Sequence, residues 1–121
     1  MKQKTIFVVD DDPGILEVIT IILTERNYKV VAFSDGTNIL TEVKKQKPDL
    51  IFLDIWISGS DGRDITRRLK AETETKEIPI IIVSALNETE KIAKEVGADS
   101  FLAKPFDIDT LARQVTKFTK M

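Results

Sequence analysis

Residues 5–33 have the sequence TIFVVDDDPGILEVITIILTERNYKVVAF, which contains one complete strand–helix–strand pattern. The first apolar run, Thr5–Val9, is short and ends in three aspartates. The next segment opens with Pro13, which follows an aspartate that can cap a helix. Four of its apolar residues fall on one helical face: Ile15, Ile19, Ile22 and Leu23. A second apolar run, Lys29–Phe33, predicts the next strand.

The same alternation continues along the rest of the sequence. Further apolar runs predict strands at Leu50–Leu53, Ile80–Val83 and Phe101–Ala103. Amphipathic segments predict helices at Thr37–Lys47, in the charged segment around Ile65 and Leu69, at Glu88–Val96 and at Asp107–Lys120. The last helix is expected to turn its apolar side chains inward: Ile108, Leu111, Ala112, Val115 and Phe118. Strands that alternate with helices predict an α/β fold, in which helices cover both faces of a parallel sheet.

The composition excludes several classes of protein. A length of 121 residues suits one domain, and we expect a single domain over residues 1–121. The sequence has no cysteine and no histidine, which excludes disulfide frameworks, Ser-His and Cys-His nucleophiles, imidazole metal ligands and phosphohistidine carriers. The net charge of −2 provides no basic field for nucleic acid or an anionic membrane. Because the sequence has neither a membrane-length apolar run nor a signal peptide, we expect a cytoplasmic protein.

Polar side chains follow most of the predicted strands. They are Asp10, Asp11 and Asp12 after the first strand, Asp54 after the third, Ser84 after the fourth and Lys104 after the fifth. Ligands of open parallel sheets bind outside the carboxyl ends of the strands, so these groups should converge. Clustered carboxylates repel one another, and one lysine cannot balance them all. Such oxygen ligands favour Mg²⁺, with Mn²⁺ as the alternative. Lys104 and Ser84 could then bind phosphoryl oxygens, and Asp54 could become an aspartyl phosphate.

With these residues in view, the sequence resembles the receiver domain of two-component response regulators, including the stand-alone chemotaxis type. The matching stretches are VVDDDP (Val8–Pro13), LDIWISGSDG (Leu53–Gly62), VSA (Val83–Ala85), GAD (Gly97–Asp99) and KPF (Lys104–Phe106). They cover nearly the whole sequence in the order and spacing of that family. The resemblance implies a flavodoxin-like (βα)5 three-layer sandwich, with a five-stranded parallel sheet of strand order 2-1-3-4-5.

The resemblance also implies a phosphoacceptor and a metal site. Asp54 would accept a phosphoryl group from the phosphohistidine of a sensor histidine kinase or of a histidine phosphotransfer protein. Asp11 would bind Mg²⁺ directly and Asp10 often through water, with Asp54 and the backbone carbonyl of Trp56 as further ligands. Lys104 would bind the phosphoryl oxygens, together with the hydroxyl of Ser84. The protein would catalyse only its own phosphorylation and dephosphorylation, so we do not expect an enzyme.

The implied output is a switch. Phe101 occupies the aromatic switch position of the family, which packs inward when Ser84 moves toward the phosphate. The output face would be the fourth helix, fifth strand and fifth helix, roughly Glu88–Lys120. Because the sequence ends just after the fifth predicted helix, we expect output through contact with a target protein or through a self-dimer on that face. Neither nucleic acid nor a membrane is an expected partner.

Four positions qualify this picture. Ser58 stands where the family often has proline, which predicts a looser loop. Phe101 replaces the commoner tyrosine, so any readout rests on packing alone. The family places residues beside the path of attacking water at two positions, and here these are Trp56 and Leu86. Neither side chain can orient water through a carboxylate or an amide, which predicts slow loss of the phosphoryl group.

Two other classes of protein compete with this interpretation. The first is a phosphorylation-independent interaction module that has kept the receiver fold. The second is a small α/β enzyme, either an FMN-binding flavodoxin or a phosphatase with an aspartate nucleophile. Three aspartates replace the Ser/Thr-rich phosphate loop that a flavodoxin needs after its first strand, and the loops are too short for the cap of a phosphatase.

Overall fold

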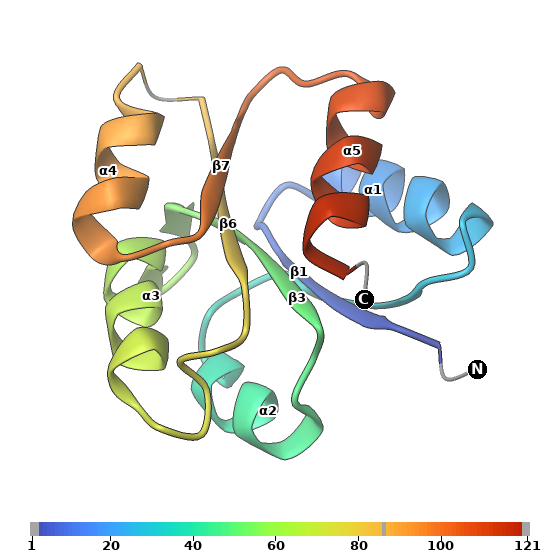
Figure 1. The fold of residues 1–121 in the computed structure, drawn as a ribbon. Helices are drawn as coiled ribbons and strands as arrows, with labels where there is room; N and C mark the ends of the chain where they lie inside the picture. Colours follow the sequence, from blue (N-terminus) through green and yellow to red (C-terminus); the bar gives the residue numbers. More distant parts are fainter. Residues whose placement is uncertain (1–2, 86, 120–121) are drawn as a thin grey trace.

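The computed structural model describes residues 3–85 and 87–119, and in this part of the chain one central sheet has helices on both faces (Figure 1). Its strands are β1 (Thr5–Val9), β2 (Lys29–Phe33), β3 (Leu50–Asp54), β6 (Ile80–Ser84) and β7 (Ser100–Ala103). All neighbouring pairs are parallel, in the order β2-β1-β3-β6-β7. This order is the predicted 2-1-3-4-5 and confirms the flavodoxin-like three-layer sandwich.

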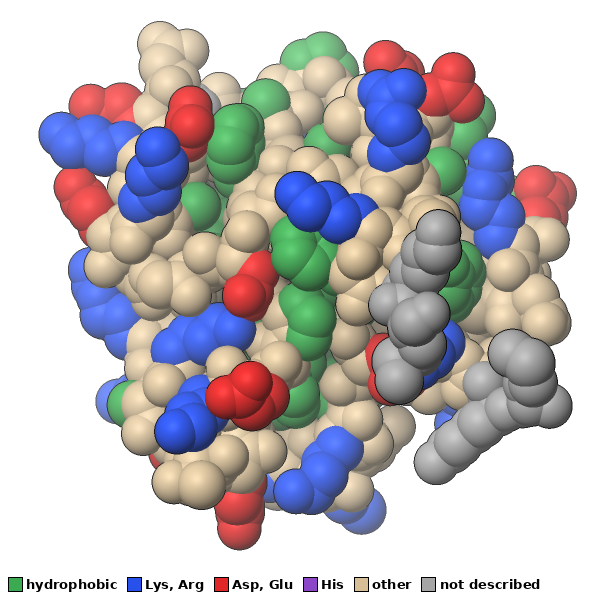
Figure 2. Space-filling model, in the orientation of Figure 1, with side chains coloured by type: hydrophobic (Ala, Val, Ile, Leu, Met, Phe, Trp, Pro, Cys, Tyr) green, Lys and Arg blue, Asp and Glu red, His purple; other side chains and the backbone are tan. Residues whose placement is uncertain are grey.

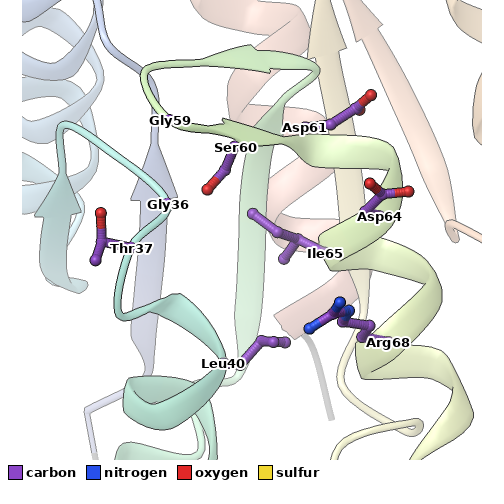
Figure 3. Close-up of a pocket in the computed structure, with 9 residues that line it drawn as sticks. All are labelled: Gly36, Thr37, Leu40, Gly59, Ser60, Asp61, Asp64, Ile65 and Arg68. Carbon is purple, nitrogen blue, oxygen red and sulfur yellow. The ribbon is translucent and has the colours of Figure 1, made fainter.

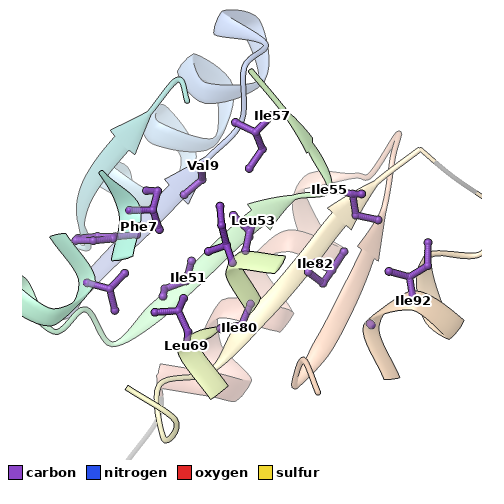
Figure 4. Close-up of a cluster of buried hydrophobic side chains, with 14 residues drawn as sticks. Phe7, Val9, Ile51, Leu53, Ile55, Ile57, Leu69, Ile80, Ile82 and Ile92 are labelled. Carbon is purple, nitrogen blue, oxygen red and sulfur yellow. The ribbon is translucent and has the colours of Figure 1, made fainter. Parts of the chain in front are cut away.

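The two layers of helices follow from the side chains that they bury. On one face lie α1 (Pro13–Glu25) and α5 (Ile108–Thr119); on the other lie α2 (Ile39–Gln46), α3 (Gly62–Ala71) and α4 (Thr89–Val96). Successive residues of a strand point to opposite faces of the sheet. In β3 this puts Ile51 and Leu53 in the core under α2, α3 and α4, while Leu50 and Phe52 pack under α1 and α5. Figure 4 shows the first of these two cores.

Most helix boundaries follow the local signals in the sequence. Asp12 accepts hydrogen bonds from the backbone of Gly14 and Ile15 and so caps α1, as predicted. Asp107 likewise accepts from the backbone of Thr110 at 2.7 Å, at the start of α5. Gly97 ends α4 in the left-handed conformation that favours glycine.

The predictions were wrong at both ends of one helix and for one side chain expected in the core. The helix expected over Thr37–Lys47 covers only Ile39–Gln46, because Asp35 holds the backbone of Thr37 in a turn and Lys47 is left-handed. Ile108 was expected inside but is 52% exposed. It is the first residue of α5, one turn before the buried Leu111, and therefore lies beyond the end of the buried stripe.

The glycine- and serine-rich stretch after β3 forms a small hairpin. Strand β4 (Trp56–Ile57) pairs antiparallel with β5 (Ser60–Asp61). Gly59 makes the turn with a φ of 77°, a conformation that other residues rarely adopt. The backbone N–H of Gly62 then donates to the carbonyl of Ile55 at 2.7 Å, which closes the base of the hairpin against the end of β3.

The surface carries interspersed charges. On the face drawn in Figure 2, acidic and basic side chains alternate around a narrow column of hydrophobic ones. Among residues 3–85 and 87–119, no helix has the length and apolar character needed to cross a membrane.

Candidate functional site

The carboxyl ends of β1, β3 and β7 bring three of the predicted site residues together. Asp10 directly follows β1, Asp54 is the last residue of β3, and Lys104 directly follows β7. The Nζ of Lys104 donates to Oδ2 of Asp10 at 2.7 Å and to Oδ2 of Asp54 at 3.2 Å. Both carboxylates are buried, with 2% and 8% of their surface exposed. One lysine therefore serves two buried carboxylates and cannot neutralise both.

Asp11 completes an acidic triad at this edge. One carboxylate oxygen from each of Asp10, Asp11 and Asp54 lies within 4.8 Å of the others, a spacing at which they could hold one cation. Asp10 and Asp54 form the buried floor, and Asp11 is exposed at the rim. Asp12 does not join them, because its carboxylate caps α1. Three hard oxygen donors fit Mg²⁺ or Mn²⁺ better than metals that prefer sulfur or nitrogen ligands.

The Asp54 carboxylate is poorly stabilised as an anion. Burial raises the pKa of Asp54, and the negative charge of Asp10 raises it further. The opposing influences are the charge and hydrogen bond of Lys104 and the backbone N–H of Ile55, which donates to Oδ1 of Asp54 at 2.7 Å. Because repulsion and burial outweigh these contacts, a cation bound at the triad would favour the ionised form.

Lys104 is held charged and in place. Burial alone would lower the pKa of Lys104, but its hydrogen bond to Asp10 and the charges of Asp54 and Asp10 outweigh burial, so the pKa is raised. Its backbone N–H donates to the carbonyl of Ser84 at 2.9 Å. That bond ties the end of β7 to the end of β6 and keeps the lysine over the carboxylates.

Ser84 and Phe101 lie on neighbouring strands. Ser84 is the last residue of β6, is 1% exposed and pairs in register with Ala103 of β7. Phe101 pairs with Ile82 and packs against the core under α2, α3 and α4. Phe101 is therefore partly buried at the border of this core. Leu86, predicted to flank the site, lies outside the described residues.

Trp56 is exposed on β4 and makes a contact that the sequence analysis missed. Its side chain is 56% exposed, and the guanidinium carbon of Arg63 lies 4.9 Å from its ring centre. Arg63 is itself fixed by Asp61, to which it donates side-chain hydrogen bonds at 2.7, 3.0 and 3.2 Å. The only signal in the sequence was the spacing of opposite charges at Asp61 and Arg63, which is common on surfaces.

The structure explains why the last residue of the LDIWISGSDG stretch, Gly62, is a glycine. A Cβ atom at this position would collide with the backbone carbonyl of Asp54. The first turn of α3 can therefore approach the end of β3 only because residue 62 has no side chain. The glycine thus allows the close packing behind the phosphoacceptor candidate.

One cavity borders the site, and another lies beside the hairpin. One, of about 310 Å³, is lined by Ile15, Val18, Ala85, Lys104, Pro105 and Phe106 and is mostly apolar. The exposed side chains of Val18 and Ile21 extend its apolar surface along α1. The other, of about 360 Å³, lies between the start of α2 and the hairpin with α3, and Figure 3 shows Gly36 and Ser60 next to each other in its lining.

The fold and this arrangement of residues match those of a known family. Residues 6–116 match the response regulator receiver domain, and the chain belongs to this family. It is therefore a receiver domain of the two-component type, and the family resemblance stated from the sequence is confirmed. Membership argues against both small-enzyme alternatives, the flavodoxin and the phosphatase.

Similar proteins differ in their overall length. Sporulation initiation phosphotransferase F of Bacillus subtilis is 37% identical over 120 residues, which cover 98% of this chain and 95% of that protein. The DNA-binding response regulator MtrA of Mycolicibacterium smegmatis is 36% identical over 95% of this chain but over only 50% of that protein. The chain thus spans about half the length of such DNA-binding relatives.

Solved structures share the fold along almost the whole chain. A putative response regulator from Chloroflexus aurantiacus superposes with a TM-score of 0.93 and 29% identity, covering 99% of this chain and all of that one. The receiver domain of a sensor histidine kinase from Pseudomonas aeruginosa PAO1 superposes with a TM-score of 0.89 and 27% identity, covering 99% of this chain and 100% of that one. That domain holds a magnesium ion coordinated in its active site cleft.

Proposed function

We propose that residues 1–121 form a single receiver domain that accepts a phosphoryl group on Asp54. The observation that carries this proposal is the pair of buried carboxylates, Asp10 and Asp54, bridged by Lys104 at 2.7 and 3.2 Å. With Asp11 at the rim, a carboxylate nucleophile, a cation site and a lysine lie together at one sheet edge. A buried cluster of this kind lowers the stability of the fold, and such clusters are typical of functional sites.

The phosphodonor is the phosphohistidine of a sensor histidine kinase or of a histidine phosphotransfer protein. An oxygen of Asp54 attacks the phosphorus, the bond from phosphorus to the imidazole nitrogen breaks, and its electron pair stays on that nitrogen. Lys104 and the Ser84 hydroxyl bind oxygens of the transferred group. Because such kinases draw phosphate from ATP, we place the exchange in the cytoplasm. The chain acts on itself only and turns over no separate substrate.

The residues present fit a divalent cation, which is Mg²⁺ with Mn²⁺ as the alternative. Asp10, Asp11, Asp54 and the backbone carbonyl of Trp56 would hold it. When bound, the cation supplies the positive charge that lets a phosphoryl group approach a carboxylate. The carboxylates of the chain orient it, and Lys104 balances the charge that is left.

The partner protein must reach Asp54 from the open edge of the sheet. The apolar cavity lined by Val18, Pro105 and Phe106 borders Lys104 and gives such a partner a contact surface next to the site. Exposed apolar surface that adjoins a polar site is typical of protein interaction surfaces. The phosphodonor therefore docks on α1 and on the connection between β7 and α5.

The output is a change on the face formed by α4, β7 and α5. A phosphoryl group adds negative charge next to Ser84 and Lys104 and biases an existing equilibrium between two conformations. Phe101, half-buried on β7, changes its packing with that equilibrium. The altered face then binds a target protein or a second copy of the chain, without nucleic acid or a membrane.

The test uses the fluorescence of Trp56, the only tryptophan of the chain. Mg²⁺ is added first and then beryllofluoride, which mimics a bound phosphoryl group. We expect a response to each, and we expect the beryllofluoride response and the mass increase with acetyl phosphate to vanish in Asp54→Ala. If the wild type responds to neither and gains no phosphoryl mass, the chain is an interaction module that works without phosphorylation.

A further inference from the structure

The three carboxylates of the acidic triad are held in place by unequal means. Asp10 and Asp54 are buried, and each accepts a hydrogen bond from a backbone N–H and another from Lys104, at 2.7 to 3.2 Å. Asp11 is exposed. Within residues 3–85 and 87–119, its carboxylate has a single hydrogen-bond partner, the hydroxyl of Ser58, which donates to Oδ2 at 3.3 Å. One ligand candidate thus depends on one serine.

Ser58 directly follows β4, and its hydroxyl is directed at the site. Ile55 and Ile57 are 0% and 5% exposed and point into the core, as Figure 4 shows. Ser58 itself begins the turn, so strand alternation does not set its direction. The hydrogen bond from its hydroxyl to Oδ2 of Asp11 shows that it faces the rim of the acidic triad.

The hairpin also restricts how far Ser58 can move. Ile57 pairs with Ser60 across the turn, and Gly59 between them has the positive φ that closes it. Two residues before Ser58, the guanidinium of Arg63 covers the ring of Trp56. The Ser58 hydroxyl is therefore presented to the rim by an ordered turn rather than by a free loop.

We infer that Ser58 is a positioning residue, which holds the Asp11 carboxylate in the orientation that binds the divalent cation. This inference rests on the proposed function. A free surface carboxylate loses rotamer entropy when a cation fixes it, and a hydrogen bond made beforehand removes part of that loss. Partners that orient metal ligands affect metal affinity in this way. Position 58 of this chain thus carries a hydroxyl that contacts a ligand candidate.

The experiment compares Mg²⁺ affinity by Trp56 fluorescence and by calorimetry. Ser58→Ala should weaken Mg²⁺ binding by about threefold to tenfold, the range expected for one hydrogen bond. Ser58→Thr keeps the hydroxyl and should bind as the wild type does. Ser60→Ala is the matched control, because Ser60 belongs to the same hairpin but faces Gly36 at the other cavity, as Figure 3 shows.

A second measurement separates positioning from general damage to the loop. In an Asp11→Ala background, Ser58→Ala should cause no further loss of Mg²⁺ affinity, because its partner is already gone. The inference is wrong if Ser58→Ala binds as tightly as the wild type, if Ser60→Ala loses as much, or if the loss persists without Asp11. A wild type that shows no Mg²⁺ binding at all would overturn the proposed function instead, and this inference with it.

Discussion

Asp61 shows how one side chain near the site combines two structural contacts. It accepts a hydrogen bond from the backbone N–H of Arg63 at 2.8 Å and so caps α3. It also pairs with the Arg63 guanidinium, which covers Trp56. The side-chain hydrogen bond from Arg63 is the main cause that lowers the pKa of Asp61. The charge of Asp61 therefore favours the folded state.

Asp61→Asn should remove the charge and keep the helix cap, because asparagine caps helices as well as aspartate does. The folded pKa lies below the unfolded value of about 3.9, so the stabilisation is full above that value and disappears as the pH falls through the folded pKa. For a partly exposed pair we expect the variant to lose about 0.5–1 kcal/mol at neutral pH. Urea unfolding at a series of pH values measures this difference.

Asp64→Asn is the control for this series. The ion pair of Asp64 with Arg67 is 3.3 Å long, and both side chains are more than half exposed, so its removal should change the free energy of unfolding little. The explanation would be wrong if the gap between wild type and Asp61→Asn stayed constant from neutral pH down into the acid range.

At the scale of elements, a lysine joins the end of α3 to the far edge of the sheet. The Nζ of Lys70 donates to Oδ2 of Asp99 at 2.6 Å and to the carbonyl of Ile78 at 2.8 Å. Asp99 also accepts from the backbone N–H of Ile80 at 2.8 Å, at the start of β6. The lysine is largely covered, with 16% of its side chain exposed. These contacts give the GAD stretch a structural role opposite the functional edge.

Lys70→Met should therefore destabilise the fold by about 1–2 kcal/mol, because the partly exposed carboxylate of Asp99 and a backbone carbonyl lose a charged partner. Lys94→Met is the matched control: Lys94 is 78% exposed in its pair with Glu90, and its loss should cost less than about 0.5 kcal/mol. Equilibrium unfolding in urea compares the two. Equal losses would show that the Lys70 contacts contribute no more than a surface pair does.

The elements were predictable where one local signal dominates. The apolar runs identified all strands of the main sheet. Strands β3 and β6 each end one residue later than predicted, at Asp54 and Ser84, and β7 begins one residue earlier, at Ser100. Asp12 identified the start of α1 because capping depends on a single residue. The pairing of the hairpin could not be predicted, because it depends on the base contact between Gly62 and Ile55 and not on an apolar pattern.

The site was predictable in outline for a different reason. Parallel strands bring their carboxyl ends to one edge, so polar residues at those positions had to meet. Contacts between side chains were not predictable, because they depend on rotamers and on loop paths. Two contacts are of this kind: the cation–π contact of Arg63 with Trp56, and the hydrogen bond from Ser58 to Asp11. The exposure of Ile108 likewise depends on where the sheet ends.

For the whole molecule, the ionised Asp54 carboxylate opposes folding in the absence of a cation. Burial and the nearby charge of Asp10 raise the pKa of Asp54, which means that the folded state disfavours the ionised carboxylate. At neutral pH this carboxylate is charged in the unfolded chain, so folding must pay for desolvating it next to another anion. Proteins accept such a local cost at functional sites.

Asp54→Asn should accordingly stabilise the metal-free protein by about 1 kcal/mol, because it removes the charge and keeps the size of the side chain. With excess Mg²⁺ the order should reverse: the wild type gains the free energy of binding, and the variant, with one anionic ligand fewer, gains less. Urea unfolding with chelator and with Mg²⁺ measures both differences. Asp35→Asn is the control, since Asp35 caps a turn before α2 and should show the same Mg²⁺ response as the wild type. If Asp54→Asn were less stable than the wild type without metal, the carboxylate would be a net stabilising group, and the balance of charges argued for this sheet edge would be wrong.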